Sequence, residues 1–480
     1  MLNLSDIKTP GVYIDEVPKF PPSVAQVETA IPAFFGYTRN TVLNGDTLIH
    51  RPIRITSMVE YEAIFGARLE EFTVDVNTVS GQNVINTAPA APTTFYRLYY
   101  SLQLYFANGG GPCYIVSIGA DDAAITLTNH TDGLAAIARE DEPTLLVFPD
   151  ALGLDRNNFY QLYQAALAQC NLLKDRFTIC DVFNGHLDYT APAGENVIDD
   201  ATLGFRTLIG NNFLLYGAAY YPQLETTLTY NYDEEAVTIT GTFNGNPAPA
   251  NSVLRVAEPA NAADEARSIY HSANQLYHQI KNAIAALPIV LPPSSAMAGI
   301  YATVDSTRGV WKAPANISLS FVRRPTVNIS DEQQENLNIH TTGKSVNAIR
   351  PFTGKGILVW GARTLAGNDA EWRYVSVRRF FNMVEESVKK ASEPFVFEPN
   401  DANTWTKVRA MIENFLILQW RAGALAGAKP EHAFYVRVGL GQTMTAQDIL
   451  DGRMIVEIGM AVVRPAEFII LRFSHKMQES

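Results

Sequence analysis

The sequence predicts a mixed α/β fold, and three observations lead to this prediction. Short apolar segments alternate with amphipathic helical segments through the first part of the chain, which is the order that βαβ units produce. Of the 480 residues, 47% are hydrophobic and 18% are charged, so the chain has ample material for a buried core. One strand-like segment also lies near each end of the chain, apart from the other predicted strands. These two segments are predicted to pair with neighbouring subunits.

The N-terminal segment combines a strand with a stiff linker. The strand lies between Pro10-Gly11 and Pro18, and no partner strand follows it at hairpin spacing. One interpretation is a loosely docked terminus, since chain ends usually fray. The other is an arm, residues 1–24, that adds a strand to the sheet of a neighbouring subunit. The apolar residues of this strand are Val12, Tyr13, Ile14 and Val17.

Strands and helices alternate after the arm. Ser57 and Glu60 have the spacing of a capping box, which opens a short helix that Gly66 ends. Alternating apolar residues over 226–243 predict a β-hairpin, and residues 264–287 are predicted to form one helix. Buried strands are expected at residues 31–37, 113–118, 144–148 and 177–182, with helices at 95–108 and 157–173.

The C-terminal part contains two helices and a terminal strand. Apolar residues recur at helical spacing over 405–420. Thr445 and Asp448 form a second capping box. Residues 462–473 are strand-like, but Pro465 cannot donate to a ladder, which favours an edge strand or an exchanged strand. Its apolar residues near the end are Phe468, Ile469, Ile470 and Leu471.

The net charge of −12 is unevenly distributed. Residues 1–299 contain 31 Asp/Glu and 15 Lys/Arg, whereas residues 300–480 contain 18 and 22, together with all five tryptophans. An acidic, solvated exterior and a near-neutral body packed against something else are therefore predicted. An acidic protein repels a nucleic-acid backbone, so no nucleic-acid partner is expected.

The compartment is predicted from what the sequence lacks. The opening residues have no basic and apolar regions of a secretory signal. No apolar run approaches the roughly 18 residues of a membrane span, so no direct membrane insertion is expected. The three cysteines fit a reduced compartment and are predicted to be buried apolar residues, namely Cys113, Cys170 and Cys180.

Motifs for catalysis, cofactors and metals are incomplete. Thr342-Gly343-Lys344-Ser345 resembles the end of a phosphate-binding loop, but Asn338 stands where the first glycine is required. The glycine run at 108–112 follows a helix, whereas a dinucleotide fingerprint precedes one. His271 and His278 have no metal-ligand spacing. No enzyme activity, cofactor or metal is predicted, and residues 342–345 are interpreted as a polar linker turn.

Seven short motifs occur in order and together span nearly the whole chain. Each is weak alone, but in this order they resemble the contractile tail sheath proteins of phages and related injection systems. The motifs are TPGVYIDE (9–16), YFANGGGPCYIV (105–116), AAYYP (218–222), PPSSAMAGIYATVDSTRGVWKAPAN (292–316), GARTL (361–365), WRYVSVRR (372–379) and VRPAEF (463–468).

The resemblance implies a discontinuous architecture. The chain ends, with residues 346–480, would form a core sheath domain that carries the terminal strand arms. Residues 25–345 would form an outer α/β domain inserted between the chain ends. Residues 225–290 fit the family least and are interpreted as a subgroup-specific insertion.

The resemblance also implies a mechanical function. The subunit would polymerise around an inner tube protein and contract to drive the tube through a target envelope, without nucleotide hydrolysis. Its partners would be other copies of itself, the tube, a baseplate, and terminator or cap proteins. It would assemble in the producer cytoplasm and become part of a phage tail or a released extracellular injection particle.

The helix that Thr445 opens is a candidate contact with the tube. A sheath must hold its tube and then release it, which favours polar contacts. The candidate residues are Gln447, Asp448, Asp451 and Arg453. The alternative is a solvated helix face.

Two alternative functions stay open at this point. A non-contractile shell or adhesin-like assembly protein would share the terminal arms but would not contract. A nucleotide-binding enzyme would depend on residues 342–345. Electron microscopy distinguishes them, since long hollow tubes indicate a sheath and discrete particles indicate the others.

Overall fold

The computed structural model describes residues 24–79, 82–89, 96–190, 196–243 and 246–472. These residues form two compact units. Unit 1 combines the described residues of Met1–Val27 with those of Phe381–Ser480, and unit 2 comprises Glu28–Phe380. The boundary predicted after residue 345 lies instead after residue 380. The reason is that β17 (Val346–Phe352) and β18 (Gly356–Trp360) pair within the sheet of unit 2.

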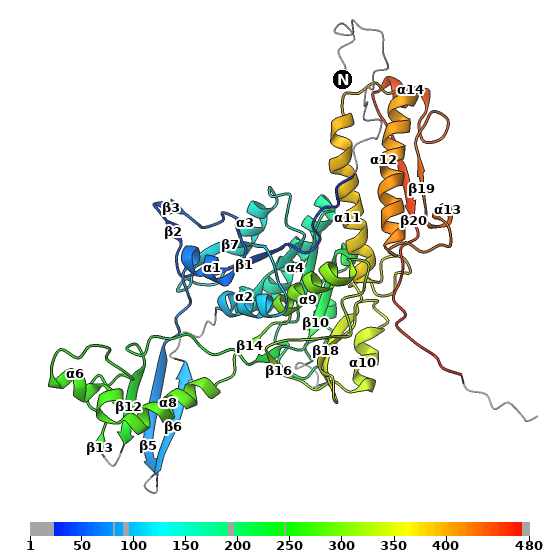
Figure 1. The fold of residues 1–480 in the computed structure, drawn as a ribbon. Coiled ribbons are helices and arrows are strands. Elements are labelled where there is room, and N and C mark those ends of the chain that lie inside the picture. Colours follow the sequence, from blue (N-terminus) through cyan, green and yellow to red (C-terminus); the bar gives the residue numbers. More distant parts are fainter. Residues whose placement is uncertain (1–23, 80–81, 90–95, 191–195, 244–245, 473–480) are drawn as a thin grey trace, which may run out of the picture. The chain divides into compact units, whose positions relative to one another are not determined.

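A nine-stranded sheet forms the centre of unit 2 (Figure 1). Its other strands are β1 (Pro32–Thr38), β4 (Ile53–Ile55), β7 (Cys113–Ala120), β8 (Leu145–Val147), β9 (Phe177–Asp181), β10 (Gly217–Tyr221) and β15 (Ile317–Ser318). The order is β15-β18-β17-β10-β9-β8-β1-β7-β4, and the six strands from β17 to β7 run parallel. The predicted mixed α/β class and its parallel pairing are confirmed.

Helices cover both faces of this sheet, which explains why its central strands are apolar throughout rather than alternating. The helices of one face are α2 (Leu98–Ala107) and α9 (Ser294–Arg308), and those of the other are α3 (Leu127–Ile137) and α4 (Arg156–Leu173). Successive side chains of a strand point to opposite faces. Phe34 of β1 therefore packs against Tyr105 of α2, whereas Phe35 stacks on Phe148 in the other core.

Unit 2 also contains a lobe with its own sheet and core. The sheet has the order β13-β12-β5-β6, and its elements are β5 (Phe72–Val79), β6 (Gln82–Pro89), β12 (Thr238–Phe243), β13 (Asn246–Pro247) and the helix α8 (Asn274–Ala286). Phe72, Ile239 and Ile280 lie in one buried cluster. The segment interpreted as an insertion, residues 225–290, thus shares its sheet and core with residues 72–89.

Two predictions within this lobe are wrong. The hairpin predicted over 226–243 does not form, because β12 pairs in parallel with β5. The single helix predicted over 264–287 is divided into α6 (Ala262–Arg267), α7 (Ile269–Ser272) and α8. Ser268 interrupts it because its extended backbone bridges to Val253 and its hydroxyl accepts from the N–H of Val256.

The remaining elements of unit 2 are short. Ser57 caps α1 (Met58–Phe65), since its hydroxyl accepts from the N–H of Glu60 at 3.3 Å. The other half of the predicted capping box does not form, because the Glu60 carboxylate accepts from the N–H of Thr56 at 2.7 Å. These elements are β2 (Val42–Leu43), β3 (Asp46–Thr47), α1 (Met58–Phe65), α5 (Phe205–Leu208), β11 (Leu224–Thr226), β14 (Val290–Leu291), β16 (Val322–Pro325) and α10 (Asp331–Asn338).

Unit 1 contains two long helices and a two-stranded sheet. Its elements are α11 (Val375–Ser392), which begins in unit 2, α12 (Ala402–Arg421), α13 (Pro430–Ala433), β19 (Phe434–Arg437), α14 (Ala446–Leu450) and β20 (Glu457–Met460). The helix predicted over 405–420 is confirmed as α12, which buries Val408, Ile412 and Phe415. The strand predicted over 462–473 does not form within one chain. Val462 makes a single bridge to Leu425, and the described residues 463–472 lie outside any strand.

Candidate functional site

The carboxyl ends of β1 and β8 mark the place where this kind of sheet usually binds a ligand. β1 lies between β7 and β8, which follow it in the order of the sheet's parallel strands. The chain therefore enters β7 on one side of β1 and then enters β8 on the other side. This reversal of direction creates a topological switch point beside β1. Ligands of open α/β sheets bind in the crevice at such a point.

In this chain, the buried carboxylate of Asp150 lies at this place. Asp150 follows β8, and its carboxylate accepts hydrogen bonds from the backbone N–H groups of Tyr37 at 2.8 Å, Leu98 at 3.0 Å and Arg97. The last two begin α2, which has no N-cap side chain of its own. Asp150 therefore caps α2 from another element. A Cβ atom on Gly36 would lie 2.6 Å from Asp150 Oδ2, so a larger residue would displace the carboxylate.

Asp181, at the end of β9, caps the N-terminus of α9. Its carboxylate accepts from the N–H of Ser294 at 3.0 Å and from the Ser294 hydroxyl at 2.6 Å. Burial raises the pKa of the Asp150 carboxyl to about 6 and the pKa of the Asp181 carboxyl to about 7. The buried Arg97 guanidinium opposes this rise in both pKa values. The helix N-termini that could bind an anionic ligand thus carry the chain's own carboxylates.

These two caps were missed from the sequence. A local cap is recognised because the capping residue directly precedes the helix. Asp150 and Asp181 instead lie 52 and 113 positions away from the residues they cap. The available signal was indirect, since Asp150 lies shortly after one apolar strand and Asp181 ends another.

Replacing Asp181 with Asn should flatten the pH dependence of stability. The pKa of Asp181 in the folded chain is raised above its unfolded value, so its contribution to stability is complete at low pH and is lost as the pH rises through about 7. Asparagine keeps a carbonyl oxygen for the Ser294 N–H and does not titrate. We expect denaturant titrations to show a larger loss of stability from about pH 4.5 to 7.5 in the wild type than in Asp181→Asn. Equal losses of stability in the two proteins would contradict the raised pKa of Asp181.

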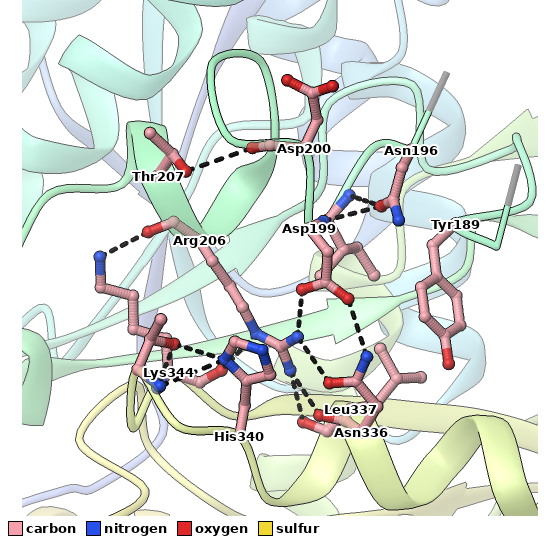
Figure 2. Close-up of polar contacts among 12 residues, drawn as sticks. Tyr189, Asn196, Asp199, Asp200, Arg206, Thr207, Asn336, Leu337, His340 and Lys344 are labelled. Carbon is pink, nitrogen blue, oxygen red and sulfur yellow. Dashed lines mark hydrogen bonds and ion pairs between the residues drawn. The ribbon is translucent and has the colours of Figure 1, made fainter. Parts of the chain in front are cut away.

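The loop at residues 342–345 lies in the polar cluster that Figure 2 shows. Lys344 is 5% exposed, and its ammonium group donates to the backbone carbonyl of Arg206. The hydroxyl of Ser345 donates to the carbonyl of Asn338 at 2.7 Å. The loop leads into β17, whereas a phosphate-binding loop leads from a strand into a helix. The lysine and hydroxyl that would bind phosphate are thus engaged within the chain.

Arg206 lies at the centre of this cluster (Figure 2). Its side chain is 3% exposed and pairs with the carboxylate of Asp199. The guanidinium also donates to the side chain and carbonyl of Asn336 and to the carbonyls of Leu337 and Lys344. All five N–H donors therefore have acceptors, and the cluster ties α5, α10 and the loop before β17 together. It is a satisfied structural network.

The four candidate tube-contact residues lie on and just after α14 and contact one another. Asp448 forms the predicted capping box with Thr445. The amide of Gln447 donates to Asp451 at 2.8 Å. The Arg453 guanidinium lies 3.7 Å from Asp448 and 3.6 Å from Asp451. Gln447, Asp451 and Arg453 are exposed, so they form a compact, solvent-facing group of both charges.

The C-terminal segment is the clearest unpaired apolar feature of the described chain. Phe468, Ile469, Ile470 and Leu471 are 66%, 78%, 80% and 72% exposed. Isolated exposed apolar residues are common, but here four in succession form one continuous exposed apolar stretch. The N-terminal arm residues Val12, Tyr13, Ile14 and Val17 lie outside the described residues.

Three further observations concern other classes of function. Among the described residues, no helix is long and apolar enough to cross a membrane. The same part of the chain has no group of three or more His, Cys, Asp or Glu side chains arranged to hold a metal ion. Cys113, Cys170 and Cys180 are free and buried, as predicted.

Sequence comparison finds similarity between this chain and tail sheath proteins. Residues 368–476 match the family described as phage tail sheath C-terminal domain. A stretch of 143 residues is 28% identical to the tail sheath protein of Burkholderia phage BcepMu, covering 29% of this chain. That alignment spans only 30% of the phage protein, and those with the tail sheath proteins of Vibrio phage KVP40 and Enterobacteria phage T4 span 19%.

Solved structures extend the similarity to nearly the whole chain. The helical sheath of the anti-feeding prophage in its contracted state is 32% identical, with 98% of this chain and 99% of that chain covered and a TM-score of 0.65. The contracted sheath of the extracellular contractile injection system PVC is 32% identical over 98% of both chains, with a TM-score of 0.64. The fold and these matches define a structural protein of a phage tail-like particle. The chain belongs to the contractile tail sheath family.

Proposed function

We propose that this chain is the repeating subunit of a contractile sheath that surrounds an inner tube. The near full-length similarity to two contracted sheaths is the observation that carries the proposal. Unit 1, which combines both ends of the chain, corresponds to the core sheath domain, and unit 2 to the outer domain. The sheath contracts because its subunits rotate as rigid bodies and repack, driven by the lower free energy of the contracted lattice.

Subunits are joined by strand exchange. Residues 468–471 expose apolar side chains that burial in a neighbour would remove from water. In the described chain, β19 and β20 form a sheet of only two strands, which is marginal alone and gains stability from added strands. The C-terminal segment and the N-terminal strand around Ile14 are the added strands, since strand addition satisfies backbone donors and acceptors on both sides.

The other partners follow from the same assignment. The sheath encloses an inner tube protein, starts on a baseplate and ends at a terminator or cap protein. It assembles in the producer cytoplasm as part of a phage tail or a released injection particle. The protein is not an enzyme and hydrolyses no nucleotide. The internal contacts of Lys344 and Ser345 support this, because they use the groups that would bind a phosphate.

Electron microscopy of the purified protein tests the proposed function. Long hollow tubes with a helical lattice are expected. Discrete closed particles would favour a shell or adhesin-like protein, and a soluble monomer at all concentrations would contradict polymerisation.

Asp451→Lys should reduce the yield of tube-filled sheaths and leave sheath self-assembly intact. The change reverses one charge in the exposed group on α14 and opposes Arg453. Because exposed charge contacts are screened by salt, the defect should depend on salt concentration. Asp46→Lys is the matched control, since Asp46 is an exposed carboxylate paired with Arg51 in unit 2. Wild-type co-purification of tube protein at low and high salt would remove this helix as the contact.

A further inference from the structure

The chain passes between the two units twice, and both passages begin next to one buried ion pair in unit 2. The first passage lies between Val27 and Glu28, and the second lies between Phe380 and Phe381. Thr29 is the second residue of unit 2 after the first passage, and Arg379 is the second-last residue of unit 2 before the second. Asp305 of α9 contacts both of these residues.

The contacts among these three residues are close and shielded from water. Arg379 binds the carboxylate of Asp305 through two parallel hydrogen bonds of 3.0 Å and 2.5 Å. The same guanidinium donates to the carbonyl of Thr29 at 2.8 Å, and the Thr29 hydroxyl donates to Asp305 at 2.6 Å. The Arg379 and Asp305 side chains are 3% and 7% exposed. We call this group the Asp305 clamp.

The clamp is fixed to the body of unit 2. The Arg379 guanidinium lies over the ring of Tyr301, 4.5 Å from its centroid. The hydroxyl of Tyr301 is 2.7 Å from that of Tyr220 on β10, so α9 is tied to the central sheet. A planar guanidinium suits both the two-pronged bond and the aromatic contact, which an ammonium would not reproduce.

The next residues on the other side of each passage belong to unit 1. The N–H of Val27 donates to the hydroxyl of Ser387 on α11 at 3.0 Å, and Gln26 accepts from Gln419 on α12 at 3.1 Å. Val27 is therefore held within unit 1, whereas Thr29 is held within unit 2. At the second passage, α11 is a continuous helix with no glycine or proline in its interior.

We propose that the Asp305 clamp sets the pivot between the two units. It limits the freedom of the first passage to the backbone bonds between Val27 and Thr29, and it holds the N-terminal part of α11 so that this helix acts as a lever. Arg379 and Thr29 are positioning residues in this device.

The clamp is tested by measuring the spread of distances between the units. Spin labels would be placed by Leu172→Cys on α4 and Leu418→Cys on α12, both exposed positions, while the native cysteines are buried. Labelled chains are diluted with unlabelled protein so that only distances within one chain are recorded. Asp305→Asn and Arg379→Lys should each broaden the distance distribution about twofold.

Arg68→Lys is the matched control, because Arg68, which is 12% exposed, pairs with Glu70 and Asp121 rather than with a clamp residue. It should lower stability without broadening the distribution. Thr29→Val keeps the ion pair and loses one hydroxyl, so this variant tests the clamp if the charge variants do not fold. It should speed amide exchange only near residues 28–31. An unchanged distribution in a folded clamp variant would overturn the proposal. Faster exchange throughout unit 2 would also overturn it, since the pair would then act only on stability.

Discussion

Ile469→Asp should abolish tube formation and leave a folded protein. Ile469 is 78% exposed in the single chain, so its replacement removes little packing within the subunit. In an exchanged strand, the same side chain would enter an apolar sheet face, where an unpaired carboxylate is strongly unfavourable. A cost of about 3 kcal/mol per contact weakens each association more than about a hundredfold. Sedimentation and electron microscopy should show unassembled protein, with circular dichroism close to that of the wild type.

Leu172→Asp is the control for this variant. Leu172 is 79% exposed on α4 of unit 2, so it undergoes the same apolar-to-acidic change outside the proposed arm. This variant should form tubes. Tubes from Ile469→Asp would refute the C-terminal arm, and a large loss of its monomer stability would show that the segment packs within its own subunit.

Deleting residues 1–19 should have a comparably large effect. The deletion removes the predicted strand that contains Val12 and Ile14, and it leaves Pro21 and Pro22 of the linker in place. If this strand pairs only with a neighbour, the truncated chain stays folded and soluble but forms no sheath. A deletion of residues 1–8 keeps the strand and should still assemble. Normal sheaths from the longer deletion would show that the segment is a dispensable terminus.

The central fold was predictable where the signal was local. The run Ile31–Tyr37 predicted a buried strand because apolar residues on both sides of a strand require covered faces. The structure confirms this, since Phe34 and Phe35 enter separate cores. The capping box of Thr445 and Asp448 was likewise predictable, because both residues lie within one helical turn.

Pairings between distant segments were not predictable. Nothing local indicates that β5 joins β12, because four strands of the central sheet, β7 to β10, lie between them in the sequence. The boundary after residue 380 was missed for a related reason, since α11 crosses it within a continuous helix. The two candidate arms could be predicted only in part. Their apolar residues predicted an interaction, but the pairing of an exchanged strand depends on a second subunit.

Helical reconstruction of the assembled sheath before and after triggering tests the central claim most directly. The tubes should be imaged on their inner tube in the absence of nucleotide, then after a contraction stimulus such as mild denaturant. The proposed function predicts two lattices, with a smaller rise per subunit and a larger diameter after triggering, while the folds of both units stay the same. A single unchanged lattice that only dissociates under the stimulus would contradict a contractile sheath and indicate a static shell.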